Sequence, residues 1–308
     1  MTSTGGKLMI FMQHLQNINQ KIQQYFWPLI YKDNLKKLAL FYSTKWGDES
    51  GEHLYAQHYE KHFAHLRNKQ LKILEIGIGG YDDPSEGGSS LKLWKTYFPN
   101  SMIYGIDIVD KKAFEEDRIK IFQGSQDDEH FLKNVIAETG ELDIIIDDGS
   151  HINQHVIKSF KTLFPALKDG GIYIVEDTHT SYWPSLVGER WFNFGKGNVY
   201  LESLANVGGS LDLNNPQTSI NFFKRLIDGL NHEEFLFPGY VPSYFDTHIV
   251  AMHFYHNLVI LYKGNNIEGS NILENNTLQP YILEAMGVNS VNELGLDFNS
   301  VAHQYVRD

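Results

Sequence analysis

Two acidic runs follow apolar, strand-like stretches of the chain. The run Asp147-Asp148-Gly149-Ser150-His151 follows Ile144-Ile145-Ile146, and Glu176-Asp177 follows Ile172-Tyr173-Ile174-Val175. Neighbouring strands of a sheet lie about 4.8 Å apart, so we expect Asp148, Glu176 and Asp177 to converge if these strands are neighbours. Three carboxylates that close do not all stay ionised without a compensating charge. Because oxygen ligands without thiolates suit Mg²⁺ or another hard divalent cation, the pattern predicts a cation site.

A structural alternative exists for each of these residues. Asp and Ser commonly cap the helix that follows a strand, so some of the acids could serve only as caps. His151 could lie in the first turn of that helix and face solvent. Asp147 is interpreted as a structural acid or as one on the cofactor side of the site. Acids at the ends of both strands favour the cation site, since helix capping does not require them on both.

A second set of residues, upstream in the chain, has the pattern of a site for an adenosine-bearing ligand. Glu75-Ile76-Gly77-Ile78-Gly79-Gly80 ends an apolar run, and glycines there allow close approach of a ligand to the backbone. Asp107 ends the next run, where a carboxylate can accept hydrogen bonds from ribose hydroxyls. Ser125-Gln126-Asp127 follows a third run and offers polar groups to an adenine edge. The alternatives are an ordinary strand-to-helix loop and a helix cap.

The same glycine-rich loop argues against a nicotinamide dinucleotide. It departs from the Gly-x-Gly-x-x-Gly fingerprint because Asp82 occupies the last glycine position, and it carries further acids at Asp83 and Glu86. Binding of a pyrophosphate is therefore disfavoured. The predicted cofactor-binding residues are Glu75, Gly77, Gly79, Asp107, Ser125, Gln126 and Asp147.

Alternating apolar runs and helical segments predict the elements that position these residues. The expected strands are 72–77, 102–108, 119–122, 142–146 and 171–175, with helices at 89–97 and 156–167 between them. Strands rich in Ile and Val that alternate with helices indicate a parallel sheet covered on both faces. Two further runs, 248–255 and 258–262, flank His256-Asn257 and predict an antiparallel hairpin. Residues 8–30 predict an amphipathic helix, and 184–215 an irregular loop or lid.

Composition excludes several classes of protein. The 308 residues are 42% apolar and 21% charged, which is ordinary for a globular protein with a real core. The formal net charge of −12 argues against nucleic acid or an anionic membrane surface as the main partner. The absence of cysteine excludes disulfides, thiolate metal sites and a cysteine nucleophile. No apolar segment has the length of a signal peptide core or a membrane span, so a cytoplasmic location is expected.

At these residues the sequence resembles the macrocin- and mycinamicin-type sugar O-methyltransferases, metal-dependent enzymes that modify natural products. The resemblance covers roughly residues 40–185, with a looser match in the 248–263 hairpin. It depends on four motifs: Leu74-Glu75-Ile76-Gly77-Ile78-Gly79-Gly80, Tyr104-Gly105-Ile106-Asp107, Asp147-Asp148-Gly149-Ser150-His151 and Val175-Glu176-Asp177-Thr178-His179-Thr180-Ser181-Tyr182-Trp183. It implies Asp148, Glu176 and Asp177 as metal ligands and His151 as general base. It also implies S-adenosylmethionine and Mg²⁺, or another hard divalent cation, as cofactors.

The resemblance implies a class I methyltransferase fold: an α/β, Rossmann-like, mostly parallel seven-stranded sheet with a terminal antiparallel hairpin and an N-terminal helical extension. The expected divisions are 1–68 as a helical auxiliary region, 69–265 as the methyltransferase domain with a lid insertion at about 184–246, and 266–308 as a C-terminal tail. The expected partner is a small-molecule natural-product acceptor, with neither nucleic acid nor membrane and with homo-oligomerisation open.

The acceptor is open between a macrolide-type sugar and a hydroxyl of a polyketide or peptide toxin of the microcystin type. The alternatives to methyl transfer are an NAD-dependent oxidoreductase and a non-catalytic scaffold that binds S-adenosylmethionine.

Overall fold

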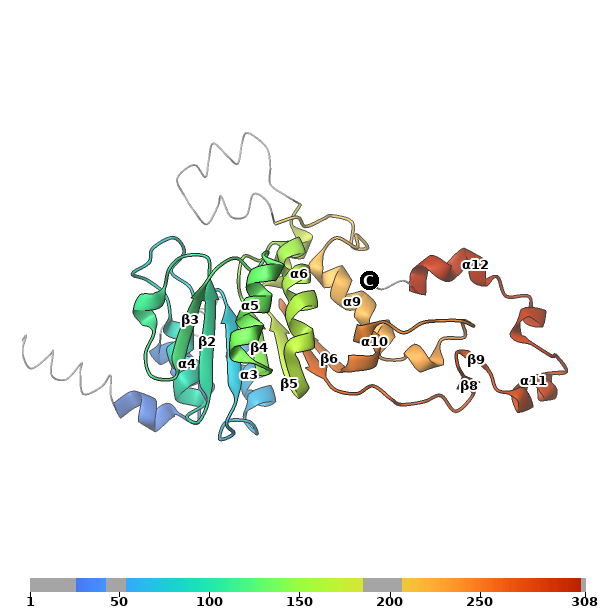
Figure 1. Cartoon of the computed structure of the whole chain (residues 1–308), viewed down its shortest axis with the longest axis horizontal. Helices are drawn as coiled ribbons and strands as arrows, with labels where there is room; N and C mark the ends of the chain where they lie inside the picture. The colour runs from blue at the N-terminus through green and yellow to red at the C-terminus, as the bar shows by residue number, and fades with distance from the viewer. Residues whose placement is uncertain (1–25, 43–53, 185–206, 306–308) are drawn as a thin grey trace, which may run out of the picture. The chain divides into compact units, whose positions relative to one another are not determined.

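The structure is a computed structural model that describes residues 26–42, 54–184 and 207–305 (Figure 1). The chain divides into two compact units. The first comprises residues 1–72, 78–105 and 109–123; the second comprises 73–77, 106–108 and 124–308. The predicted site residues other than Gly79 all fall in the second unit. Each unit is therefore described by itself, and the site within the second.

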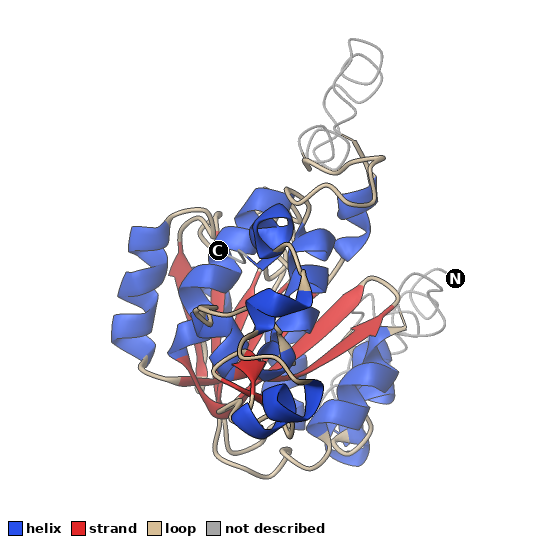
Figure 2. Cartoon of the chain, turned by 90° about the vertical axis from the view of Figure 1, so that its right-hand side faces the viewer, coloured by secondary structure: helices blue, strands red, loops and turns tan. Residues whose placement is uncertain are grey.

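Seven strands form one sheet, in the order β3-β2-β1-β4-β5-β7-β6. Figure 2 shows the strands in red and the helices in blue. Their bounds are β1 Lys72–Ile76, β2 Met102–Asp107, β3 Ile119–Gln123, β4 Leu142–Asp147, β5 Leu167–Val175, β6 Ile249–Tyr255 and β7 Leu258–Lys263. Strand β4 pairs in parallel with β1 and β5, whereas β7 pairs antiparallel with β5 and β6. The predicted sheet, with its terminal hairpin, is confirmed.

The first unit is built on an aromatic core. Its helices are α2 (Leu35–Phe41), α3 (Tyr55–Phe63) and α4 (Ser89–Tyr97), and β2 lies mostly within it. Tyr59 and Phe63 of α3 meet Trp94 edge-on, with ring centroids 5.3 and 5.8 Å away, and Phe98 closes the cluster. All four side chains are fully buried. Edge-to-face packing of this kind adds to the free energy gained from apolar burial.

The second unit holds the parallel strands β1, β4 and β5 and the β6–β7 hairpin. Its helices are α5 (Glu129–Thr139), α6 (Asn153–Leu163), α9 (Ser219–Gly229) and α10 (Tyr244–His248). Phe160 of α6 is the centre of its core: it contacts Tyr173 of β5, Phe223 of α9 and Phe245 of α10, with ring centroids 5.0 to 5.2 Å apart. This packing sets α6 against the sheet, which fixes where α6 begins beside the carboxyl ends of β4 and β5.

The C-terminal part of the chain carries short elements only. Strands β8 (Leu273–Glu274) and β9 (Thr277–Leu278) form a small separate pair, and α11 (Pro280–Met286), α12 (Phe298–Val301) and short 3₁₀ turns follow. No helix among the residues described is both long and apolar enough to cross a bilayer.

Some boundaries differ from the sequence expectation. The helix predicted at 156–167 ends at Leu163, because Pro165 lies in the 3₁₀ turn that follows and cannot continue an α-helix. Strand β5 then begins at Leu167 and runs through both glycines. The predicted amphipathic helix at 8–30 and the 184–215 loop lie largely outside the described residues. The predicted domain boundaries stay predictions.

Candidate active site

The carboxyl ends of the parallel strands are aligned by backbone hydrogen bonds just beyond the strands. Gly77 N donates to Ile106 O at 2.8 Å, and Asp148 N donates to Ile76 O at 3.0 Å. Glu176 N donates to Asp147 O at 2.9 Å. The first residue after each of these strands thus donates a backbone hydrogen bond to a neighbouring strand, so the loops start from one edge of the sheet. This is the edge at which open α/β sheets bind their ligands.

Asp148, His151 and Asp177 come together at this edge. The Nε2 atom of His151 lies 3.9 Å from Oδ1 of Asp148 and 3.6 Å from Oδ2 of Asp177. Each residue offers one ligand atom, and these atoms lie within 4.8 Å of one another. All three side chains are partly exposed, at 32%, 26% and 13% for Asp148, His151 and Asp177. Two carboxylates and an imidazole at that spacing fit a divalent cation in chemistry and in reach.

Glu176 has a different environment from the two aspartates. It lies between Val175 and Asp177 in the chain, yet it is only 2% exposed, and the three-residue group above does not include it. The convergence predicted for Asp148 and Asp177 is thus present, with His151 in the same cluster. Glu176 as a metal ligand stays a prediction.

Two of the clustered residues have left-handed backbone conformations. His151 has φ of +54° and Asp177 has φ of +52°. His and Asp are among the residues that tolerate this region, and such conformations persist when surrounding contacts hold them. For His151 one such contact is the hydroxyl of Thr180, which donates to His151 O at 2.8 Å. The contact links the loop after β5 to the loop after β4.

Asp147 is turned away from this cluster into the interior. It is 1% exposed, and its carboxylate accepts hydrogen bonds from Gln126 Nε2 at 3.0 Å and from Ser159 Oγ at 2.5 Å. Burial raises the pKa of Asp147 to about 6, although the hydrogen bonds from Ser159 and Gln126 oppose that rise. Its role as a structural acid, one of the two interpretations open from the sequence, has direct hydrogen-bond support.

The residues predicted to bind the cofactor, other than Gly79, belong to the second unit. Glu75 is fully buried near the end of β1, Asp107 ends β2, and Ser125 follows β3. Gly77 comes directly after β1 with φ of +79°. Gly79 belongs to the first unit and is exposed, with φ of +76°. Contact of these residues with a cofactor stays a prediction.

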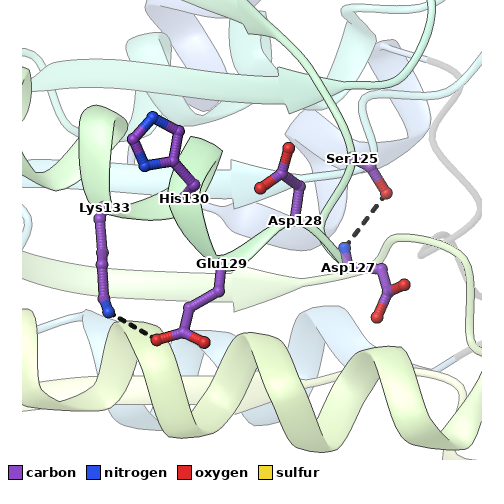
Figure 3. A pocket seen from close by; sticks show the side chains of 6 residues that line it. All are labelled: Ser125, Asp127, Asp128, Glu129, His130 and Lys133. Atoms are coloured by element: carbon purple, nitrogen blue, oxygen red, sulfur yellow. Dashed lines mark hydrogen bonds and ion pairs between the residues drawn. The ribbon is translucent and has the colours of Figure 1, made fainter.

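A surface hollow of about 610 Å³ lies beside Ser125 (Figure 3). It is lined by Ser125, Asp127, Asp128, Glu129, His130 and Lys133. The Ser125 hydroxyl accepts from Asp127 N at 3.2 Å, and Asp128 caps α5 by accepting from Phe131 N at 3.0 Å. Lys133 pairs with Glu129 one turn away at 2.6 Å. The cap of α5 is therefore Asp128, one residue beyond the Ser125-Gln126-Asp127 segment for which a helix cap was the alternative, and the lining is that of a solvated helix start.

Gly77 is required by both its backbone and its surroundings. A Cβ atom there would lie 2.2 Å from Asp148 O, which cannot move without displacing the acidic loop. We expect Gly77→Ala to lower the free energy of unfolding by more than the roughly 1–2 kcal/mol of a left-handed L-residue alone. Gly170→Ala is the matched control, since Gly170 has φ of +80° with nothing within 4 Å. Equal losses for the two variants in urea unfolding would contradict this expectation.

Several residues that hold the site in place were not found from sequence. Thr180 contacts His151, Ser159 contacts Asp147, and Asn153 Nδ2 donates to Val207 O at 2.6 Å. Gln126 was predicted to contact the cofactor, but its contacts with Asp147 and the backbone of Ser150 were not predicted. Each contact joins residues far apart in the chain, so no local pattern indicates it. The only signal available was that Thr180 lies within the second of the two motifs that carry the acids.

Relatives of the chain are O-methyltransferases of natural-product glycosides. Over 240 residues it is 42% identical to demethylmacrocin O-methyltransferase of Streptomyces fradiae, covering 77% of this chain and 55% of that protein. Over 222 residues it is 43% identical to mycinamicin VI 2''-O-methyltransferase of Micromonospora griseorubida, covering 70% and 50%. A tetracenomycin-C rhamnosyl 3'-O-methyltransferase of Streptomyces olivaceus is 42% identical over 229 residues, covering 74% and 53%.

Solved structures give the same result. The structure of the MycE methyltransferase from the mycinamycin biosynthetic pathway, in complex with Mg, SAH and mycinamycin VI, matches with a TM-score of 0.67 and 40% identity. That match covers 78% of this chain and 57% of the MycE chain. A second MycE structure, with Mg and SAH, matches at a TM-score of 0.68. No protein-family model matches the chain. This chain spans about half the length of the curated relatives it matches.

Proposed function

We propose that the protein methylates a hydroxyl of a natural-product glycoside. The proposal is supported by the membership of this chain's matched region in the family of macrocin- and mycinamicin-type sugar O-methyltransferases. The methyl donor is S-adenosylmethionine, and a hard divalent cation such as Mg²⁺ is the metal cofactor. The observation that carries the proposal is the cluster of Asp148, His151 and Asp177 at the edge where β1, β4 and β5 end.

The cation would be held by Asp148 and Asp177, with Glu176 as the third predicted ligand. Both aspartates are partly exposed at the sheet edge and close enough to share one ion. When bound, such a cation acts as a Lewis acid that lowers the pKa of a hydroxyl. The carboxylates also benefit, because their mutual repulsion is relieved. Carboxylate oxygens, in a chain without cysteine, favour Mg²⁺ over a thiolate-binding metal.

His151 would accept the proton of the acceptor hydroxyl. Its Nε2 lies near both aspartates, and the ring is 26% exposed, so it can exchange a proton with solvent after turnover. As the O–H proton goes to Nε2, the oxygen forms a bond to the sulfonium methyl. The carbon–sulfur bond breaks with its electrons on sulfur, which leaves S-adenosylhomocysteine. The Thr180 contact holds the left-handed backbone of His151 from which the imidazole projects.

The cofactor would be held by residues of the second unit. Asp107 would accept from the ribose hydroxyls, and Gly77 would present backbone without a side chain. Glu75 and Ser125 complete the set at the ends of β1 and β3. Support for S-adenosylmethionine comes from the MycE structures, which contain Mg and SAH.

A sugar hydroxyl is the acceptor we favour over a polyketide or peptide hydroxyl. The names of three relatives specify a glycosylated substrate: two act on rhamnosyl-bearing tetracenomycin-C compounds and one on L-olivosyl-oleandolide. The shared feature is therefore the sugar. A small-molecule acceptor also agrees with the strongly acidic chain, since a net charge of −12 disfavours nucleic acid.

The test is methyl transfer from labelled S-adenosylmethionine to a panel of glycosides and their aglycones, read by mass spectrometry with and without Mg²⁺. We expect label only on glycosides and only with the cation. Label on aglycones alone would contradict the sugar assignment, and label in the presence of EDTA would contradict the cation. A parallel titration should show binding of S-adenosylhomocysteine but not NAD; the reverse would support an oxidoreductase instead.

A further inference from the structure

The side-chain amide of Gln126 is buried against the loop between Asp148 and His151. Its Oε1 accepts from Ser150 N at 2.6 Å, and its Nε2 donates to Asp147 Oδ1 at 3.0 Å. The residue is 6% exposed. One end of the amide thus binds Asp147, the last residue of β4, and the other binds Ser150, in the loop that bears the proposed cation ligand and the proposed base.

Gly149 shows how closely the amide fits. A Cβ atom on Gly149 would lie 2.0 Å from Gln126 Oε1 and 3.0 Å from Ile76 Cγ2. Gly149 does not have a positive φ, so its backbone conformation is open to any residue. Glycine is needed here because the Gln126 amide occupies the space where a side chain would begin.

Asp147 anchors the other end of the amide to rigid elements. It is the last residue of β4, and its second oxygen accepts from Ser159 of the buried face of α6 at 2.5 Å. The amide therefore holds the backbone of Ser150 in place relative to β4 and α6. A buried amide or carboxylate left without its partner costs free energy, so the pair resists rearrangement.

We propose that Gln126, held by Asp147, is a positioning residue that sets the spacing between Asp148 and His151, rather than a contact to the cofactor. The proposal rests on the proposed function in that Asp148 binds the cation. Groups that orient metal ligands typically change metal affinity or activity by about 10–100-fold when they are removed. Loss of the amide frees Ser150 N and lets the loop drift while both functional side chains remain.

The first test is Gln126→Met, which keeps the length of the side chain and removes both hydrogen bonds. Mn²⁺ affinity is measured by electron paramagnetic resonance on protein saturated with S-adenosylhomocysteine, and affinity for S-adenosylhomocysteine by calorimetry. We expect a rise of about 10–100-fold in the Mn²⁺ Kd. We expect the S-adenosylhomocysteine Kd to stay within about threefold of the wild-type value. Gln154→Met, on the exposed face of α6, is the matched control and should change neither constant.

The second test reverses the polarity of the pair, so that it remains informative if Gln126→Met does not fold. Gln126→Glu alone keeps an acceptor for Ser150 N but sets a second carboxylate against Asp147. When Asp147→Asn is added, the amide introduced at position 147 can donate to the carboxylate introduced at position 126 and still accept from Ser159. We expect the single variant to bind Mn²⁺ weakly and the double variant to recover to within about threefold of wild type. A general loss of stability would not be repaired in this way.

Three outcomes would overturn the inference. The first is unchanged Mn²⁺ affinity in folded Gln126→Met. The second is a loss confined to S-adenosylhomocysteine, which would make Gln126 a cofactor contact, as the sequence predicts. The third is a double variant that binds Mn²⁺ no better than Gln126→Glu. A wild-type protein that binds no Mn²⁺ would overturn the proposed function as well, which separates that failure from the other three.

Discussion

Replacing His151 with Ala is expected to lower kcat by about 10²–10⁴-fold, the usual contribution of a positioned general base. The affinity for S-adenosylhomocysteine should stay near the wild-type value, because the imidazole faces Asp148 and Asp177. Single-turnover methyl transfer and a calorimetric titration of the cofactor product measure the two quantities. A variant that retains more than about a tenth of the wild-type kcat would contradict the role of base.

The His151 variant also separates a base from a cation ligand. His151 lies in the same group of ligand atoms as the two aspartates, so its geometry permits either role. If His151 is the base, its removal leaves Mn²⁺ affinity nearly intact. If His151 is a ligand, its removal weakens Mn²⁺ binding as strongly as the loss of an aspartate does. His130→Ala is the control, because His130 is an exposed residue of α5 outside the cluster (Figure 3).

Replacing Asp177 with Asn is expected to remove both cation binding and methyl transfer. The substitution preserves shape but takes a charge from a side chain that is only 13% exposed. Polarisation by a bound metal contributes several kcal/mol to transition-state stabilisation. Since each 1.36 kcal/mol is tenfold in rate, we expect a loss of about 10³-fold in kcat/KM. The variant and the wild-type protein are compared by their activity across a Mn²⁺ or Mg²⁺ titration and by their Mn²⁺ Kd.

The control for Asp177→Asn is Asp169→Asn. Asp169 is an exposed acid on the same strand, β5, several residues before its carboxyl end. The Asp169→Asn substitution should leave the cation affinity and the rate of methyl transfer unchanged. EDTA treatment of the wild-type protein should reproduce the Asp177→Asn defect and be reversed by added Mg²⁺, whereas the variant should not recover at the same concentration. An Asp177→Asn enzyme as active as wild type at limiting Mg²⁺ would show that this carboxylate is not a ligand.

The parallel sheet and the location of the site could be predicted from the sequence because their signals are local. Buried strands of a parallel sheet are continuous apolar runs, and Ile144-Ile145-Ile146 and Ile172-Tyr173-Ile174-Val175 were recognisable for that reason. The residues that end such runs share one edge of the sheet by topology alone. Asp148, Glu176 and Asp177 could therefore be predicted to converge; the structure brings Asp148 and Asp177 together with His151, in a group that does not include Glu176.

Only the tertiary structure separated acids that look alike in the chain. Asp147 and Asp148 are adjacent, yet alternation along the end of β4 sends one inward to Gln126 and Ser159 and leaves the other at the edge. Glu176 and Asp177 differ in the same way, at 2% and 13% exposure. Gln126 could be assigned only to the cofactor from sequence, since its partners Asp147 and Ser150 lie 21 and 24 residues away. Local pattern determines which strands carry acids to the edge, whereas contacts between distant segments determine which of those acids face it.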